Sequence, residues 1–208
     1  MRFAKVKLWP MRREAGQAAM VLGLPGTGKR TTCRELGSMP TLVHVEAGEL
    51  LRRLNPASPA GRRAKPYLDR GELVPDELMM DAWAEHVEKL IADGDFTLEQ
   101  QILLLDGIPR TLAQGKSLRD RAEVRGLIFP DVDDDDVLVD RLLKRGETSG
   151  RADDADDAVI RRRIATHRRE VPPVLEVYPE AIRWRVDAGR EPLAVLVDVA
   201  GTASDLLG

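Results

Sequence analysis

The stretch Gly23-Leu24-Pro25-Gly26-Thr27-Gly28-Lys29-Arg30-Thr31 is a glycine-rich loop with a lysine near its end, and it follows the apolar run 18–22. Glycines carry no Cβ, so the backbone N–H groups of such a loop can turn inward around a polyphosphate, at the positive end of the next helix. The match to G-x-x-x-x-G-K predicts that Lys29 contacts the β and γ phosphates of a nucleotide. Arg30 stands where a hydroxyl residue usually follows the lysine, and the hydroxyl comes one place later, at Thr31. The stretch therefore predicts a phosphate-binding loop between a strand and a helix.

The composition is that of a folded chain with mixed charge. With 208 residues, 43% of them hydrophobic, the chain can bury the core of one domain. The net charge of −3 combines both signs along most of the sequence, so we expect no general attraction to nucleic acid or to a membrane. Cys33 is the single cysteine, which excludes an intrachain disulfide and a thiolate zinc site and favours a packing role. No apolar run approaches the roughly 20 residues of a membrane helix and no secretory signal is present, so we expect a cytoplasmic protein.

Residues 1–16 are rich in Lys and Arg and contain a single acid, Glu14. Such a segment could target an organelle, but it has no serine and is interrupted by Pro10, so we interpret it as a basic N-terminal extension. No repeat or second domain boundary follows, and residues 17–208 are expected to form a single domain.

Strands and helices alternate in the manner of a parallel α/β sheet. After the loop, residues 29–36 are expected to form a helix and 41–45 a buried strand. Further apolar strands are expected at 102–105, at 127–129, where Pro130 shortens the strand, and at 184–186. The order predicts a P-loop three-layer α/β/α fold with a parallel sheet. An acid at the end of a buried strand, here Asp106, is where a magnesium site beside a phosphate loop is usually completed.

Proline and acidic residues indicate where the other helices begin and end. Pro75 and Asp76 suit the start of a helix that reaches about residue 92. The acidic run 131–136 fits a loop and the N-terminus of a helix over 137–145 better than a metal site. A helix from 156 to about 169 is expected to end at Pro172 and Pro173, with a short helix at 174–178 and a covering helix up to residue 207.

The loop, with its P-G-x-G-K core and displaced hydroxyl, resembles that of the adenylate kinases, a family of nucleoside monophosphate kinases. A second motif, His44-Val45-Glu46-Ala47-Gly48-Glu49-Leu50-Leu51-Arg52, resembles H-I-S-T-G-D-L-L-R, in which the arginine holds the acceptor phosphate. The resemblance implies that role for Arg52. Glu46 replaces the family's serine, and Ala47 replaces a threonine near the acceptor base, as in pyrimidine-preferring relatives.

Two further motifs complete the acceptor half of the resemblance. The run 71–78, G-E-L-V-P-D-E-L, implies that Leu73 and Val74 line the acceptor base pocket, within a small mobile insert at about 46–75. The run 106–114, D-G-I-P-R-T-L-A-Q, resembles D-G-F-P-R-T-x-x-Q. It implies that Arg110 contacts the acceptor phosphates and that Gln114 hydrogen-bonds adenine. Gln114 favours AMP, in contrast to Ala47, because pyrimidine-preferring relatives tend to carry asparagine near the position of Gln114.

The run 141–154, R-L-L-K-R-G-E-T-S-G-R-A-D-D, resembles the short lid of the family, here at about 146–154. The resemblance implies that Arg145 and Arg151 close on the donor and transferring phosphates. Of the three arginines at 161–163, Arg163 best matches the family's catalytic arginine, and Arg162 is the alternative if the register slips by one. The turn at 187–189 resembles the closing turn whose backbone, near Gly189, touches the donor adenine.

The resemblance implies a monomer that catalyses reversible, Mg²⁺-dependent phosphoryl transfer from ATP to AMP, giving two ADP. The residues implied for catalysis are Lys29, Arg110, Arg145, Arg151 and Arg163. Those implied for ATP are Gly26, Thr27, Gly28, Lys29, Arg30, Thr31, Arg141, Arg145 and Gly189. Those implied for AMP are Ala47, Arg52, Leu73, Val74, Gly107, Arg110, Gln114, Arg151 and Arg163. Those implied for magnesium are Asp106, through water, and Thr31.

Two alternatives stay open. Glu46 and Ala47 leave room for a kinase of UMP, CMP or another monophosphate. Arg30 and Glu46, which replace the family's glycine and serine, leave room for a nucleotide-binding regulatory protein on the same fold without catalysis.

Overall fold

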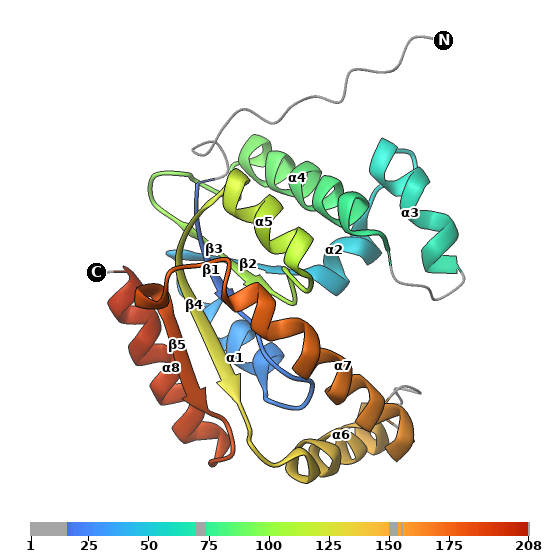
Figure 1. The fold of residues 1–208 in the computed structure, drawn as a ribbon. Helices are drawn as coiled ribbons and strands as arrows, with labels where there is room; N and C mark the ends of the chain where they lie inside the picture. The colour runs from blue at the N-terminus through green and yellow to red at the C-terminus, as the bar shows by residue number, and fades with distance from the viewer. Residues whose placement is uncertain (1–15, 70–73, 150–153, 155, 208) are drawn as a thin grey trace.

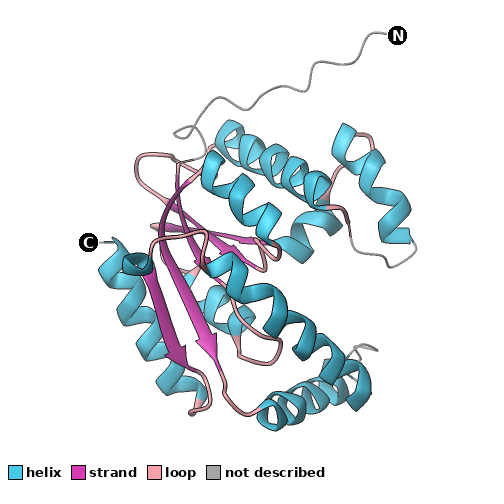
Figure 2. Cartoon of the chain, viewed as in Figure 1, coloured by secondary structure: helices cyan, strands magenta, loops and turns pink. Residues whose placement is uncertain are grey.

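A computed structural model describes residues 16–69, 74–149, 154 and 156–207. Its centre is a sheet of five parallel strands in the order β2-β3-β1-β4-β5, with helices on both faces (Figures 1 and 2). The strands are β1 (Gln17–Val21), β2 (Leu42–Glu46), β3 (Ile102–Asp106), β4 (Glu123–Asp131) and β5 (Arg183–Asp187). The expected three-layer α/β/α fold is confirmed.

The described helices connect and cover these strands. They are α1 (Lys29–Leu36), α2 (Ala47–Arg53), α3 (Pro59–Asp69), α4 (Asp76–Asp93), α5 (Leu112–Arg121), α6 (Asp135–Ser149), α7 (Asp157–Leu175) and α8 (Pro192–Leu207), with a short 3-10 turn at Glu180–Ile182. None of these helices is long and apolar enough to cross a membrane.

Each face of the sheet has its own apolar core. Along β1, Ala18 and Met20 point into a cluster with α4 and α5, whereas Ala19 and Val21 point into a cluster with α1 and α8. All four side chains are buried, as the two-residue period of a strand covered on both faces requires. The near-continuous apolar runs of the sequence are therefore explained by burial of both faces.

The sheet order places a ligand crevice at the carboxyl ends of β1 and β3. β1 and β3 are neighbours in the sheet. From β1 the chain continues toward one edge of the sheet, to β2, and from β3 it continues toward the opposite edge, to β4. Such a switch point opens a crevice outside the strand ends in open α/β sheets. The glycine-rich loop follows β1, and Asp106 ends β3.

The expected break of α7 at Pro172 and Pro173 is wrong, because the helix continues through both prolines to Leu175. An internal proline removes a backbone hydrogen bond and costs about 3 kcal/mol. Val171 and Val174, on either side of the prolines, are buried, and Val174 lies against the α5 backbone at Gly115. Apolar packing along this segment offsets the local cost, which is a tertiary effect.

The expectation that Pro130 shortens its strand is also wrong, since β4 runs for nine residues and includes this proline. β1 pairs with β4 only as far as Ile128, whose carbonyl accepts a hydrogen bond from the N–H of Leu22. Pro130 lies beyond that point and still aligns with Val186 of β5. A missing N–H is tolerated where one neighbouring strand has already ended.

Helix α6 is longer at both ends than the expected 137–145. It begins at Asp135 and ends at Ser149, so the first residues of the expected lid loop, 146–149, are helical. Glycine is required at position 146 by close packing rather than by a loop conformation, because a Cβ there would lie 2.5 Å from the Asp154 carbonyl oxygen. Residues 150–153 of the expected lid lie outside the described residues, as do residue 155 and residues 1–15 of the N-terminal extension.

Candidate nucleotide-binding site

The glycine-rich loop joins β1 to α1 in a conformation that only glycine supports. Gly28 is the N-cap of α1 with φ 85°, in the left-handed region. At Gly23, a Cβ would come within 2.6 Å of the Pro130 carbonyl oxygen on β4. The loop is thereby pressed against the sheet, and the N-terminus of α1 opens toward the crevice.

Lys29 is held inside this loop. Its Nζ donates a hydrogen bond to the Leu24 carbonyl oxygen at 2.6 Å, and Thr27 Oγ1 donates to the same oxygen at 2.9 Å. Burial lowers the pKa of Lys29 from 10.5 to about 8, although the charge of Asp106 opposes the shift. A desolvated ammonium group gains most when an anion reaches it, which suits a phosphate ligand.

Asp106 lies beside the ends of β1 and β2, opposite Val21 and Glu46 in the sheet register. It is 6% exposed. Mg²⁺ prefers oxygen ligands and is commonly bound through one or two carboxylates together with substrate phosphates. A buried carboxylate beside a phosphate loop fits this cation, and Thr31 stands exposed on the first turn of α1.

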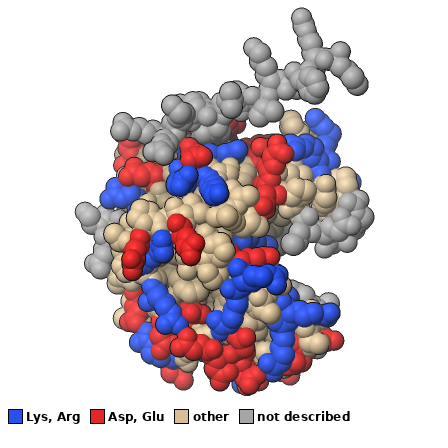
Figure 3. All heavy atoms as spheres, viewed as in Figure 1, with Lys and Arg blue, Asp and Glu red and all other residues tan. Residues whose placement is uncertain are grey.

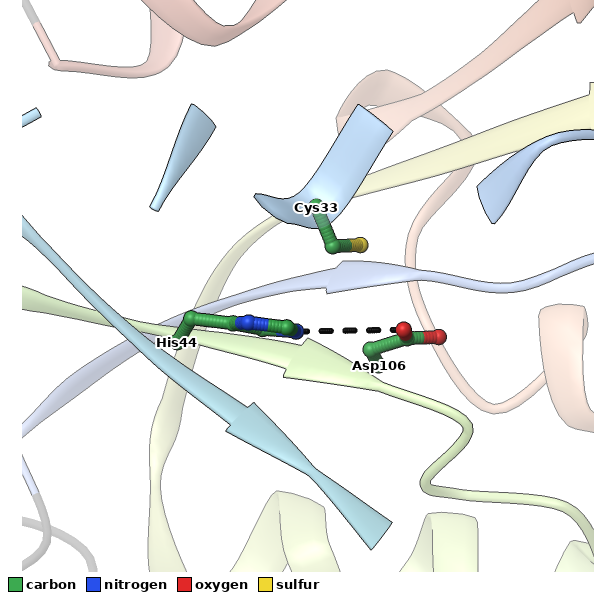
Figure 4. A group of neighbouring side chains, drawn as sticks. All are labelled: Cys33, His44 and Asp106. Atoms are coloured by element: carbon green, nitrogen blue, oxygen red, sulfur yellow. Dashed lines mark ion pairs between the residues drawn. The ribbon is translucent and has the colours of Figure 1, made fainter. Parts of the chain in front are cut away.

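Cys33 and His44 lie next to Asp106 and point toward it (Figure 4). His44 Nε2 is 3.8 Å from Asp106 Oδ2. Burial raises the pKa of the Cys33 thiol, so without a cation nearby this group is neutral. No expectation from the sequence connected these two residues to Asp106, because they come from separate elements.

Arg110 folds back over the turn that follows β3. Its Nε donates to the Gly107 carbonyl oxygen at 2.8 Å, and Gly107 has φ 75°. Burial lowers the pKa of Arg110, while the charge of Asp106 opposes this shift and that of Arg163 adds to it. Since an arginine stays protonated over the physiological range, a fixed cation stands at the crevice.

Gln114 is buried in a polar network. Its side-chain oxygen accepts a hydrogen bond from the Arg110 N–H at 2.8 Å, and its amide nitrogen donates to Asp76 at 2.7 Å. Thr111 Oγ1 donates to the other Asp76 oxygen at 2.6 Å. An amide has two N–H donors and two oxygen lone pairs, so these two hydrogen bonds use one of each. The sequence indicated only a helix start at Asp76, and its role in orienting Gln114 was missed.

The other expected acceptor residues lie around α2 and the start of α4. Ala47, the first residue of α2, is completely buried, and Val74 is partly buried just before α4. Arg52 belongs to the last turn of α2, but its side chain and the whole of Leu73 lie outside the described residues.

Asp154 joins the two arginines expected near the transferring phosphate. This residue is fully buried, and its carboxylate pairs with Arg145 of α6 at 2.6 Å and with Arg163 of α7 at 2.8 Å. By contrast, Arg161 pairs with Asp157 and Arg162 Nε donates to a helix carbonyl, both on the exposed surface. The geometry thus turns the third arginine of the run inward. Arg151 lies outside the described residues.

The role of Asp154 as a bridge was missed by sequence reasoning, which used it only as part of the lid motif. The only indication of this role in the sequence was an acid at the end of an arginine-rich run, and such a pattern also occurs on solvated surfaces. The position of α6 against α7 makes the difference.

Arg141 links α6 to the turn after β5. Its Nη1 donates to the Ala188 carbonyl oxygen at 2.7 Å, and the Gly189 N–H donates to Asp187 Oδ1 at 2.9 Å. The structure therefore brings together two segments that the resemblance associates with ATP.

Arg30 and Glu46, the two departures from the family motifs, lie next to each other. Arg30 Nε is 3.4 Å from Glu46 Oε2, with the Arg30 side chain 62% exposed and that of Glu46 15% exposed. The charge of Glu46 also acts to raise the pKa of Arg110. The two replacements therefore form one charge pair at the edge of the site.

Acidic residues of the run 131–136 form ion pairs with arginines. Asp131 pairs with Arg185 at 2.9 Å, and Asp135 pairs with Arg168 at 2.6 Å. Asp135 and Asp136 occupy the first turn of α6, where acids favour the helix dipole. These pairs tie β4, β5, α6 and α7 together.

Basic groups surround the crevice. Lys29 lies within electrostatic reach of Asp106, Arg110 and Arg145. Figure 3 shows a hollow between the part of the molecule that carries α2 to α4 and the part that carries α6 and α7, with Lys and Arg side chains on its wall. A phosphate loop, a buried acid on the neighbouring strand and several fixed cations define a P-loop nucleotide-binding phosphotransferase.

A family model described as adenylate kinase matches residues 21–183. The chain therefore belongs to the adenylate kinase family, and its enzyme class is that of a phosphotransferase. It is 34% identical over 177 residues to an adenylate kinase of Synechococcus sp., a match that covers 83% of this chain and 88% of the relative. It is 33% identical over 182 residues to an adenylate kinase of Thermus thermophilus, covering 84% and 90%. With adenylate kinase isoenzyme 1 of Caenorhabditis elegans it shares 34% over 175 residues, covering 83% and 80%.

Proposed function

We propose that the chain catalyses the reversible, magnesium-dependent transfer of a phosphoryl group from ATP to AMP, giving two ADP. The observation that carries this proposal is the group of cations around a buried acid, in which the charge of Asp106 acts on Lys29 and Arg110, and Arg145 lies within electrostatic reach of Lys29. Family membership supports the same reaction.

The chemistry asks for fixed positive charge rather than for a covalent nucleophile. In phosphoryl transfer the equatorial oxygens and the leaving oxygen carry much negative charge, and water must be kept away. Lys29 binds the β and γ phosphates of ATP, and Arg145, Arg151 and Arg163 neutralise the transferring group. No general base is required, because the attacking AMP phosphate is already anionic.

The remaining roles divide between the two nucleotides. On the donor side, the loop from Gly26 to Thr31 cradles the phosphates, and Arg141 and Gly189 border the ATP base. On the acceptor side, Arg52 and Arg110 hold the AMP phosphate beside Gly107. Ala47, Leu73, Val74 and Gln114 border the AMP base. Bound magnesium supplies neutralisation of the ATP phosphates, and Asp106 would hold it through water, with Thr31 as a further oxygen donor.

A coupled assay with AMP, UMP and CMP at equal concentration, each with ATP and Mg²⁺, tests the acceptor. We expect AMP to be phosphorylated fastest, because an amide such as that of Gln114 can both donate and accept hydrogen bonds with adenine. Rapid turnover of UMP or CMP with none of AMP would replace the proposal by the pyrimidine alternative that Ala47 keeps open.

The substitution Arg110→Ala separates an enzyme from a regulatory protein that only binds nucleotide. We expect transfer to fall by about two to four orders of magnitude, because a fixed cation near the transferring charge is lost. Arg119→Ala, which removes a half-exposed arginine of α5, serves as the matched control and should transfer phosphate at the wild-type rate. ATP binding without transfer in the unmodified protein would favour the regulatory alternative.

A neighbouring pair of substitutions tests the register on α7. Arg163→Ala should lower kcat by at least about tenfold, whereas Arg162→Ala should leave it within about twofold of wild type. The reason is that the Arg163 side chain faces Asp154 while Arg162 is exposed. The reverse order of effects would assign the catalytic role to Arg162.

A further inference from the structure

Three side chains that could coordinate one cation converge beneath α1. Cys33 comes from α1, His44 from β2 and Asp106 from the end of β3. One possible ligand atom of each, a sulfur, a ring nitrogen and a carboxylate oxygen, lies within 4.8 Å of the other two (Figure 4). The fold thus assembles a mixed thiol, imidazole and carboxylate cluster from segments that are up to 73 positions apart, from Cys33 to Asp106.

The cluster is largely shielded from solvent, with the His44 side chain 20% exposed, and one of its polar atoms lacks a hydrogen bond. Cys33 is fully buried and Asp106 is 6% exposed. Nε2 of His44 is buried and has no hydrogen-bond partner among the described residues. The nearest Asp106 oxygen, at 3.8 Å, is too far for a hydrogen bond. A buried polar atom without a partner is costly, so a ligand at this point would gain free energy.

The backbone holds His44 in this place. His44 and Glu46 lie on the same face of β2, and Glu46 is the register partner of Asp106 on β3. At Gly37, which follows α1, a Cβ would come within 2.8 Å of His44 Cβ. The glycine therefore lets the histidine lie close under the end of α1, on the side where Cys33 points.

We propose that Cys33, His44 and Asp106 form a site for a zinc-type divalent cation, with water as the fourth ligand. Thiolate and imidazole select such cations over Mg²⁺, which prefers oxygen alone. In tetrahedral zinc sites the ligand atoms lie roughly 3.4 to 3.6 Å apart, given bonds of about 2.0 to 2.3 Å, so small side-chain rotations suffice here. On binding, the Cys33 S–H bond breaks, its proton goes to solvent, and a sulfur–metal bond forms.

The single cysteine led to the expectation that a thiolate zinc site is excluded. That expectation counted cysteines alone, whereas the fold adds a histidine and an aspartate to one thiol. This site shares Asp106 with magnesium. If the proposed phosphoryl transfer holds, a zinc-type cation bound here removes Asp106 from the magnesium site and inhibits the reaction.

Cobalt titration of the full chain, without nucleotide, tests the site directly. Co²⁺ takes the same ligands as zinc, and a thiolate ligand gives it a sulfur-to-cobalt charge-transfer absorption band. We expect one equivalent of Co²⁺ to produce this band, Cys33→Ala to abolish it, and His44→Gln to weaken Co²⁺ binding at least about tenfold. His86→Gln, on α4, is the control and should bind as wild type does. Absence of the band in the wild-type chain, or its survival in Cys33→Ala, would overturn the proposal.

Zinc inhibition gives a second readout. Phosphoryl transfer by the wild-type chain should be inhibited by Zn²⁺ and restored by a chelator, whereas Cys33→Ala and His44→Gln should keep their basal rate and resist inhibition. Equal inhibition of all three proteins would place the inhibitory cation elsewhere and overturn the link to Asp106. If the wild-type chain transfers no phosphate, the proposed function fails, and the cobalt spectrum still decides the site. Circular dichroism of both variants checks that each has folded.

Discussion

Arg30 and Glu46 are informative at the scale of single residues, because two unusual side chains turn out to be neighbours. The carboxylate of Glu46 lies close enough to Arg110 for their charges to interact, and it partly cancels a positive charge that would bind phosphate. Arg30, at the start of α1, supplies an opposite charge 3.4 Å from that carboxylate. Arg30 thus offsets the negative charge that Glu46 brings to the crevice.

We therefore expect the effects of Arg30→Gly and Glu46→Ser to depend on each other. Arg30→Gly alone should raise the KM for nucleotide about two- to fivefold, since an exposed ion pair is worth about 0.5–1 kcal/mol. Adding Glu46→Ser should return KM to near the wild-type value. Steady-state kinetics of the four proteins in a double-mutant cycle measures the coupling. Strictly additive effects would mean that the two residues act independently.

Lys29 makes a prediction about pH. Its pKa is lowered to about 8 by burial, so the ammonium form is present below that pH and is lost as the pH rises through it. Because free enzyme must hold this charge to capture ATP, kcat/KM for ATP should fall above about pH 8. A bound phosphate raises the pKa again, and kcat at saturating ATP should fall at a higher pH. A pH profile of both parameters tests this, and identical profiles would contradict it.

At the scale of elements, α6 and α7 are joined through Asp154. Gly146 on α6 leaves room for the Asp154 backbone, while Arg145 on α6 and Arg163 on α7 pair with the Asp154 carboxylate. An arginine clamp of this kind orders the cations on the wall of the crevice before any nucleotide arrives. Positioning that is achieved in the free protein lowers the cost of binding.

Two glycine substitutions test this packing. In a helix interior Gly→Ala stabilises by up to about 1 kcal/mol through propensity alone. Gly201→Ala in α8 meets nothing within 4 Å, so the free energy of unfolding should rise by about that amount. Gly146→Ala would instead place Cβ 2.5 Å from the Asp154 carbonyl oxygen, and we expect unfolding free energy and kcat both to fall. Urea denaturation and steady-state assays measure these changes. Equal stabilisation by both substitutions would show that Asp154 does not approach α6.

At the scale of the whole molecule, the sheet divides the chain into two apolar cores and collects the polar chemistry at one edge. The glycine-rich loop and Asp106 end adjacent strands, Arg110 follows β3, and Lys29, Arg145 and Arg163 come from the helices α1, α6 and α7. If the proposed function holds, nucleotides at this edge contact both the part around α2 to α4 and the part around α6 and α7, which lie on either side of the hollow (Figure 3). Binding should therefore stabilise the entire fold.

The thermal midpoint, Tm, measures that linkage. ATP at 100 times its Kd should stabilise the chain by about 2.7 kcal/mol, which corresponds to a Tm rise of about 5–11 °C for a chain of this size. In Lys29→Met the rise should disappear. The Tm without ATP should not fall at pH 7, because the lowered pKa shows that burial disfavours the Lys29 charge. An unchanged ATP effect in this variant would argue against Lys29 as a phosphate ligand.

Local patterns in the sequence predicted most of the elements that frame the site. Residues 29–36 are helical as expected, and Asp106 ends a buried strand beside the loop. These predictions succeed because glycine at a tight turn and apolar runs in a sheet act over a few neighbouring residues. Pro172, Pro173 and Pro130 misled the prediction, because a proline's effect depends on whether packing offsets the lost hydrogen bond and whether a neighbouring strand needs its N–H.

The sequence by itself determined the parallel α/β class, the phosphate loop and, through its motifs, the family. Each of these depends on short-range spacing, which a linear chain carries in full. Only the tertiary structure decided that Arg30 pairs with Glu46, that Asp154 joins Arg145 to Arg163, and that Cys33 and His44 meet Asp106. These contacts join separate helices and strands, and the register of the sheet and the packing of helices on it determine which distant residues come into contact.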